Sequence, residues 1–382
     1  MKSAFVVSSP MTVRAFLQDQ IRALAATHDV TVVSNFQEPG ELGTLPASVR
    51  IERVGIHRKI AVAADLQALF VLWRFFRQQE FDVVHSVTPK AGLLSMLAAR
   101  FAGVPHRLHT YTGQVWATKH GLARALFRAL DKVIFTMSSR CYVDSNSQRD
   151  FLISEGVVDV ERSQVLAHGS ISGVDLERFS ASEVVRASMR VDLGISENAF
   201  VCLFLGRLSR DKGVLDLVQA FLRLDESGVE SVLLIVGPDE DGMHAKIQQL
   251  IGDARSRIVF VDFTDVPERY MNAADLFCLP SYREGFGSVV IEAAAVGIPA
   301  LGSNIYGISD AIENGVTGLL HEPRGIDDIH SKLTLLRDDH ELRVRMGEAA
   351  MARARTMFAK ELVTASLVAE YAQLEASLSA VS

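Results

Sequence analysis

Residues 275–281 read Asp-Leu-Phe-Cys-Leu-Pro-Ser, and residues 284–292 read Glu-Gly-Phe-Gly-Ser-Val-Val-Ile-Glu. The first run predicts a short buried strand that stops at Pro280, and the segment from Ser288 predicts a helix. Gly297 lies where such a helix commonly ends, and a proline follows soon after it. A strand that turns directly into a helix in this way indicates an α/β fold.

The turn between this strand and helix carries the residues of an anion site. Gly285 and Gly287 allow the backbone to approach a ligand closely, so that amide groups and the positive end of the helix dipole face an anion such as a diphosphate. Glu292 lies one turn inside the helix, where its carboxylate can accept two sugar hydroxyls, and Glu284 can hold another hydroxylated group. The alternative is an ordinary strand-turn-helix with solvated glutamates.

Apolar runs alternate with helical patterns along the rest of the chain. In the first half the predicted strands lie near 4–9, 29–35, 49–55, 82–88, 106–112, 140–146 and 163–168. In the second half they lie near 200–207, 231–237, 257–263, 275–280, 299–303 and 318–321. This alternation predicts two doubly wound parallel sheets, Rossmann-like, which bind ligands beyond the carboxyl ends of their strands and face each other across a cleft.

The domain boundaries follow from where the alternation weakens. We expect a first domain at 1–175, a linker at 176–197 and a second domain at 198–359. The last helices, near 339–357 and 360–379, carry no evident chemistry, and the segment 360–382 is expected to cross back to the first domain.

Composition favours a globular enzyme. The chain has 382 residues, of which 48% are hydrophobic and 22% charged, with a net charge of −7. Its three cysteines lack metal-ligand spacing, which predicts packed thiols in a reducing compartment and no disulfide. We find no secretory signal and no credible transmembrane segment, and the acidic total disfavours nucleic acid as a partner.

One basic helix stands out in the first half, which is the more basic half. Lys119, Arg124, Arg128 and Lys132 accompany apolar residues at helical spacing. Such a helix can rest on an anionic membrane surface, and the alternative is a core-packing helix with one solvated face.

Two cations follow the first strand of the second half. Arg207 and Lys212 lie in the sequence Gly-Arg-Leu-Ser-Arg-Asp-Lys-Gly at 206–213, at the carboxyl end of that strand. Fixed cations there would neutralise a diphosphate leaving group without a metal. Surface salt bridges are the alternative role.

The sequence Asp239-Glu240-Asp241 also has two interpretations. An Asp-X-Asp after a strand can hold a divalent metal on a nucleotide sugar. Acids at the start of a helix are also favourable caps, and we favour that interpretation because the two cations make a metal unnecessary. We therefore expect no metal and no cofactor beyond the nucleotide-sugar substrate.

Taken together, these motifs resemble the retaining GT-B glycosyltransferases of family 4. The resemblance rests on 206–213, on 284–292 and on Asn-Gly-Val-Thr-Gly-Leu-Leu at 314–320. It extends to the first half through His-Ser-Val-Thr-Pro-Lys-Ala-Gly at 85–92 and His-Thr-Tyr-Thr-Gly at 109–113, and to the hinge Gly-Val-Asp at 173–175. The first-half motifs look closest to hexosaminyl or galactosaminyl transferases that act on polyprenyl-diphosphate-linked saccharides in bacterial surface-glycan pathways.

The resemblance implies a role for each matching residue. It implies that the nucleotide sugar is bound by Arg207, Lys212, Glu284, Gly285, Phe286, Gly287, Ser288 and Glu292. His109, by resemblance alone, lies near the reacting sugar and joins Glu284, Arg207 and Lys212 in the catalytic surroundings. Two departures leave acceptor contacts open: Ser-Ser-Pro-Met-Thr-Val-Arg at 8–14 replaces a glycine-rich loop, and Tyr-Gly-Ile-Ser-Asp at 306–310 replaces Gly-Gly-X-Pro-Glu.

The expected activity is that of a retaining hexosyltransferase (EC 2.4.1.-). It would move a sugar, with an N-acetylhexosamine as one candidate, from a UDP-linked donor to a saccharide or a polyprenyl-diphosphate-linked acceptor. We expect it in the cytoplasm, with peripheral contact to the cytoplasmic face of the inner membrane left open. The alternatives are a sugar-nucleotide epimerase or hydrolase of the same fold, and a non-catalytic binder of sugar nucleotides or glycolipids.

Overall fold

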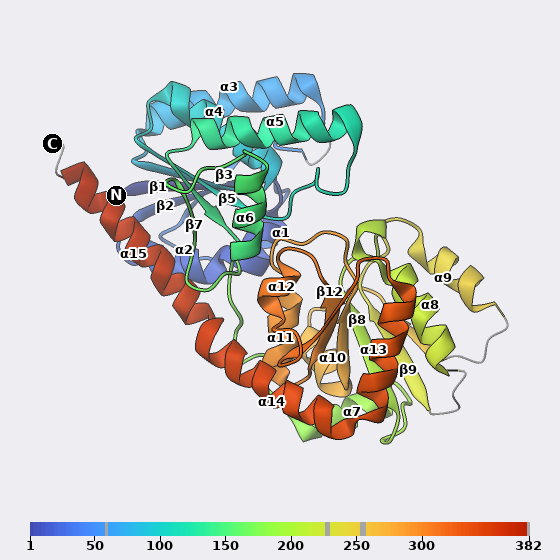
Figure 1. Cartoon of the computed structure of the whole chain (residues 1–382). Coiled ribbons are helices and arrows are strands. Elements are labelled where there is room, and N and C mark those ends of the chain that lie inside the picture. Colours follow the sequence, from blue (N-terminus) through green and yellow to red (C-terminus); the bar gives the residue numbers. More distant parts are fainter. Residues whose placement is uncertain (58–59, 226–229, 253–256, 380–382) are drawn as a thin grey trace. The chain divides into compact units, whose positions relative to one another are not determined.

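The computed structural model describes residues 1–57, 60–225, 230–252 and 257–379 (Figure 1). The chain forms two compact units, the first from Met1–Ser172 with Lys360–Ser382, the second from Gly173–Ala359. Each unit is built on one parallel sheet, of seven strands in the first and six in the second. The predicted fold class, two doubly wound parallel α/β sheets, is confirmed.

The sheet of the first unit has the strand order β3-β2-β1-β4-β5-β6-β7. Its strands are β1 (Lys2–Val6), β2 (Asp29–Ser34), β3 (Arg50–Arg53), β4 (Val83–Val87), β5 (His106–Tyr111), β6 (Arg140–Val143) and β7 (Ser163–Val165). Its helices are α1 (Pro10–Thr12), the π-helix η1 (Val13–Leu17), α2 (Gln18–Ala25), the 3-10 helix η2 (Pro39–Leu42), α3 (Val62–Gln79), α4 (Pro89–Ala102), α5 (Gly121–Met137), α6 (Asn146–Ser154) and α15 (Lys360–Ser379). The strand order reverses at β1 and β4, where doubly wound sheets place their ligands.

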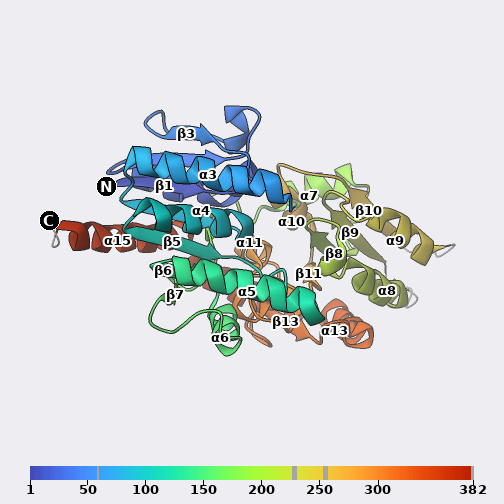
Figure 2. The same cartoon turned by 90° about the horizontal axis from the view of Figure 1, so that it is seen from above.

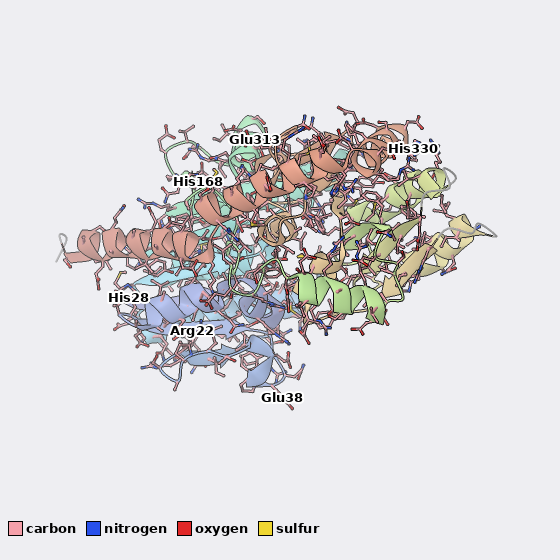
Figure 3. All side chains as sticks on the ribbon, turned by 90° about the horizontal axis from the view of Figure 1, so that it is seen from below. Arg22, His28, Glu38, His168, Glu313 and His330 are labelled. Atoms are coloured by element: carbon pink, nitrogen blue, oxygen red, sulfur yellow. The ribbon has the colours of Figure 1, made fainter. Side chains whose placement is uncertain are left out.

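Helices cover both faces of this sheet. On one face α4 packs between α3 and α5, and the three helices form one layer (Figure 2). On the other face α15 packs beside α2 and buries Leu367, Tyr371 and Leu374 in the core. Figure 3 shows this side, with Arg22 of α2 and His28 of the following loop marked; the His28 ring stacks on Tyr371 at 6.1 Å. The final helix therefore completes the core of the first unit.

The sheet of the second unit has the strand order β10-β9-β8-β11-β12-β13. Its strands are β8 (Phe200–Leu205), β9 (Ser231–Val236), β10 (Arg257–Val261), β11 (Leu276–Leu279), β12 (Ala300–Ser303) and β13 (Gly318–His321). Its helices are α7 (Glu183–Asp192), the 3-10 helix η3 (Arg210–Lys212), α8 (Val214–Asp225), α9 (Met243–Ile251), α10 (Pro267–Ala273), α11 (Ser288–Val296), α12 (Ile308–Ala311), α13 (Ile326–Asp338) and α14 (His340–Met357).

The expected linker at 176–197 is not an unstructured connection. It contains α7, whose N-cap Ser182 accepts a hydrogen bond from the amide of Val185. Arg186 and Arg190 of this helix bind the two oxygens of the Asp275 carboxylate, at 2.5 and 2.8 Å. These ion pairs fasten α7 to the second unit, so the predicted start of the second domain at 198 was too late.

The cysteines match a further expectation. Cys141, Cys202 and Cys278 are free thiols buried in the cores, as predicted. Among residues 1–57, 60–225, 230–252 and 257–379, no helix combines the length and the apolar character that crossing a membrane requires.

Candidate active site

Lys212 and Glu284 meet at the carboxyl edge of the second sheet. Gly213 has φ +66°, and a Cβ on it would lie 2.0 Å from the carbonyl oxygen of Pro280, so only glycine lets η3 approach the end of β11. The Lys212 ammonium group then forms an ion pair with the Glu284 carboxylate, which also accepts a hydrogen bond from Ser281 Oγ at 2.8 Å. The structure thus brings two of the predicted site residues together.

Arg207 emerges at the same edge, directly after β8. Here too a glycine permits the geometry, because a Cβ on Gly237 would lie 2.0 Å from the carbonyl oxygen of Gly206. The Arg207 guanidinium binds the Glu240 carboxylate at 2.6 Å and is 45% exposed. Its charge is therefore only partly screened from an incoming anion.

The glycine turn that the sequence predicts is present at the start of α11. Gly287, at φ +85°, precedes the helix, and no side chain caps it within this fully described element. The Phe286 side chain lies in the core with its ring 5.2 Å from that of Phe358, so it can offer a ligand only its main chain. A Cβ on Gly307 would lie 2.5 Å from the Gly285 carbonyl oxygen, so glycine at 307 lets the following loop close on this turn.

Glu292 lies one turn inside α11, as the sequence predicts. Burial is the main cause that raises the pKa of its carboxyl group to about 7. The charge of Arg178 lowers this pKa, and the charge of Glu268 raises it. None of the residues that the structure describes donates a hydrogen bond to this carboxylate. A partly buried acceptor without donors is costly, and two ligand hydroxyls would satisfy it.

His109 lies in the other unit, on β5, and is buried. Its Nδ1 lies 2.8 Å from Ser86 Oγ, and its ring meets Tyr111 edge-on at 4.5 Å. A Cβ on Gly92 of α4 would lie 2.4 Å from the His109 ring, so glycine makes room for the imidazole. Burial lowers the pKa of His109 to about 3, so the ring is neutral and can act only as a hydrogen-bonding group.

The structure also shows a residue that sequence reasoning missed. Asp144 follows β6 and borders a cavity of about 10 Å³, roughly the room for one water molecule, together with His85 and Thr110. Its Oδ1 is buried without a partner in the described part of the chain, and burial raises the pKa of the carboxyl group to about 8. The available signal was its place directly after a strand.

The acidic run at 239–241 caps α9. Asp239 accepts hydrogen bonds from the amides of Met243 and His244 at 2.8 and 3.0 Å, and Asp241 accepts one from the amide of Arg210. The two hydrogen bonds that Asp239 accepts are those expected of a helix cap. In the described residues no three His, Cys, Asp or Glu side chains gather as metal ligands would.

The basic cluster of Lys119, just before α5, and the cations of α5 is less free than its sequence indicates. Arg124 and Arg128 both bind the carboxylate of Glu155, at 2.6 and 3.1 Å. Lys119 lies over the ring of Phe127 at 5.8 Å. Only part of the predicted positive charge is thus available to a partner.

Comparison with known proteins places both units in described families. Residues 185–353 match the family "Glycosyl transferases group 1", and residues 12–169 match the "Glycosyl transferase 4-like domain". Each match covers most of one unit.

Several curated relatives align over most of their length. The capsular polysaccharide biosynthesis glycosyltransferase CapM of Staphylococcus aureus is 27% identical over 83% of each chain. The UDP-Gal:alpha-D-GlcNAc-diphosphoundecaprenol alpha-1,3-galactosyltransferase of Escherichia coli is 29% identical, over 75% of this chain and 74% of its own. The D-inositol 3-phosphate glycosyltransferase of Actinosynnema mirum is 30% identical, over 77% and 72%.

Solved structures share the fold at lower sequence identity. The crystal structure of Anabaena Alr3699/HepE in complex with UDP and glucose superposes with a TM-score of 0.80, covering 97% of this chain and 99% of that one at 18% identity. This likeness establishes the GT-B fold.

Proposed function

Because this chain belongs to the group 1 glycosyltransferases, we propose that it transfers a sugar from a UDP-linked donor to a saccharide carried on polyprenyl diphosphate. Its class is that of the retaining hexosyltransferases of family 4, which use nucleotide sugars. The proposal adds the UDP donor, the lipid-linked acceptor and an N-acetylhexosamine as a candidate sugar. The Escherichia coli relative is named for a UDP-galactose donor and a diphosphoundecaprenol acceptor, which supports this choice.

One observation carries the proposal. Lys212, the N-terminal end of α11 and the donor-free carboxylate of Glu292 lie along one strand-turn-helix and the loop packed against it. A nucleoside diphosphate has a group for each of these features. Its diphosphate can bind the lysine and the positive end of the helix dipole, and its ribose hydroxyls can donate to the Glu292 carboxylate.

The chemistry follows from charge. When the anomeric carbon–oxygen bond breaks, both electrons stay on the diphosphate, while the acceptor oxygen bonds the same face of the sugar and its proton passes to an oxygen of the departing diphosphate. Lys212, Arg207 and the amides of 285–288 then stabilise the developing negative charge, without a metal ion in this scheme. His109, neutral and buried, is proposed to orient a donor hydroxyl or phosphate by hydrogen bonding. Glu284, once released from Lys212, is proposed to hold the donor sugar.

A lipid-linked acceptor would bring the enzyme to a membrane. We propose peripheral contact with the cytoplasmic face of the inner membrane and a role in the synthesis of surface polysaccharide. The exposed cations of α5, to which the sequence drew attention, are consistent with such contact.

The test is a donor and acceptor screen. The full chain is incubated with a panel of nucleotide sugars and polyprenyl-diphosphate saccharides, and products are identified by mass. We expect an acceptor one sugar heavier, formed only with a UDP-linked donor. Donor conversion without acceptor would instead establish an epimerase or hydrolase, and affinity without turnover a binding protein.

A further inference from the structure

The outer face of α3 is apolar. Val62, Leu66 and Phe70, spaced by four, are 69%, 62% and 58% exposed, whereas the inward residues Leu72 and Phe76 are buried. Only one face of α3 is buried, so a stripe of large apolar side chains is left in water. The solvent-facing side of a surface helix is usually polar.

A second stripe runs along α5. Leu122 and Leu126 are 90% and 58% exposed, and Val133 continues the stripe, while Ile134 and Phe135 face the core. Because α4 lies between α3 and α5 in one layer, the two helices that carry these stripes lie on the same side of the sheet of the first unit (Figure 2). We call these two stripes together the α3–α5 surface.

The exposed charged residues on α3 and α5 have one sign, although Arg128 pairs with Glu155 at 3.1 Å. The exposed charged residues of the two helices are all basic: Arg74, Arg77, Arg128 and Lys132. Asp65 is only partly exposed and pairs with Lys90 at 2.6 Å, and Asp131 is buried and accepts a hydrogen bond from Trp116 at 2.7 Å. Apolar side chains flanked by cations match the interface of an anionic bilayer, whose acyl region takes the former and whose headgroups take the latter.

We propose that the α3–α5 surface docks this enzyme on an anionic lipid bilayer. A second copy of the chain fits less well, because a two-fold interface would bring the same cations face to face. The inference rests on the proposed function in so far as a lipid-carried acceptor gives the docking its purpose. It extends the predicted contact from the α5 cations to the apolar face of α3.

The experiment is sedimentation of the full chain with vesicles. Vesicles of phosphatidylcholine alone are compared with vesicles that contain about one-third phosphatidylglycerol. We expect binding to the anionic vesicles that weakens with salt, and at least a tenfold fall in partitioning for Leu66→Glu/Phe70→Glu and for Leu122→Glu/Leu126→Glu. The matched control is Val184→Glu/Val191→Glu on α7 of the other unit, at 80% and 78% exposure, which should bind within twofold of the unmodified chain.

Three results would overturn the proposal. One is equal binding by the unmodified chain and both surface variants, and another is binding that ignores the anionic lipid. The third is a dimer that Leu66→Glu/Phe70→Glu dissociates, in a chain that does not bind vesicles, which would make a second copy the occupant. Calorimetry with UDP distinguishes failure of the docking proposal from failure of the proposed function. Vesicle binding without UDP binding contradicts the proposed donor. UDP binding without vesicle binding contradicts only the docking role of the α3–α5 surface.

Discussion

Lys212 and Glu284 neutralise each other in the structure, so a diphosphate that binds Lys212 has to replace a carboxylate. The exchange is favourable where the ligand offers more negative charge and several acceptor oxygens. The half-buried position of the pair keeps water from weakening either interaction. We propose that Glu284 is released toward the donor sugar when the donor binds.

Lys212→Ala should therefore weaken UDP binding and slow transfer, each by about tenfold or more, since a charged hydrogen bond contributes about 1.5–3 kcal/mol. Calorimetry with UDP and turnover at saturating and subsaturating donor measure the two effects. The control is Lys332→Ala, which removes a lysine paired with Asp328 on α13. Turnover of Lys212→Ala within twofold of the unmodified enzyme would contradict leaving-group stabilisation by this residue.

Glu292 gives a pH prediction. Its pKa rises from 4.5 to about 7, so between these pH values the folded protein holds a proton that the unfolded chain has lost. Stability of the ligand-free protein should thus fall as pH rises through this window, and Glu292→Gln should gain about 1–2 kcal/mol over the unmodified protein at pH 8 but little at pH 4. UDP binding should weaken in the variant.

Urea unfolding at the two pH values measures the difference, with the exposed Glu348→Gln on α14 as control. An equal change in stability at both pH values would show that the carboxyl group does not titrate as described.

Some contacts of single residues could be predicted from the sequence, and others could not. The position of Glu292 one turn inside the helix followed from helix periodicity, because Glu292 and the glycine turn lie in one continuous strand-turn-helix. The pairing of Arg124 and Arg128 with Glu155, and the packing of His109 against Gly92, join residues far apart in the sequence. Only the fold reveals them.

At the level of elements, the approach of η3 to β11 depends on Gly213. Gly213→Ala would place a methyl group 2.0 Å from the Pro280 oxygen and keep a residue at φ +66°. We expect a loss of stability larger than the roughly 1–2 kcal/mol that left-handed backbone alone costs, and at least tenfold weaker UDP binding.

Gly156→Ala is the matched control, since Gly156 has φ +65° and open space around it. Thermal unfolding and UDP calorimetry of both variants separate the clash from the backbone strain. If both variants lose the same stability and both still bind UDP normally, the close approach has no role in the site.

Every predicted strand exists, but several were drawn too long at their carboxyl ends. The strand expected at 4–9 is β1 at Lys2–Val6, and the one at 140–146 ends at Val143. The residues after these ends, Val-Ser-Ser at 7–9 and Asp-Ser at 144–145, already belong to the loops at the carboxyl edge of the sheet, which the alternation of strands and helices does not delimit. The helix α7 was missed because Arg186 and Arg190 read as surface charge, whereas both bind Asp275 and Arg190 is buried.

For the whole molecule, the two units have separate cores, and each should respond to its own perturbation. Leu367 on α15 is fully buried in the first unit, so Leu367→Ala should lower that unit's stability by about 2–5 kcal/mol. UDP at one hundred times its dissociation constant should stabilise the second unit by about 2.7 kcal/mol.

Differential scanning calorimetry would show the first change in one transition and the second change in the other. Leu362→Ala, at an exposed site of the same helix, should move neither. A single transition that both perturbations shift would refute independent cores.

The chain passes between the units twice, at Ser172–Gly173 and at Ala359–Lys360, and the two passages meet where the amide of Val174 donates to the carbonyl of Phe358 at 2.7 Å. The second unit is thus one continuous segment of the chain, whereas the first unit consists of two segments and is complete only with α15. During synthesis on the ribosome, the second unit can fold as soon as it emerges, while the earlier-made part of the first unit keeps an open core until α15 has emerged. Chaperone protection should matter most for the half that is made first.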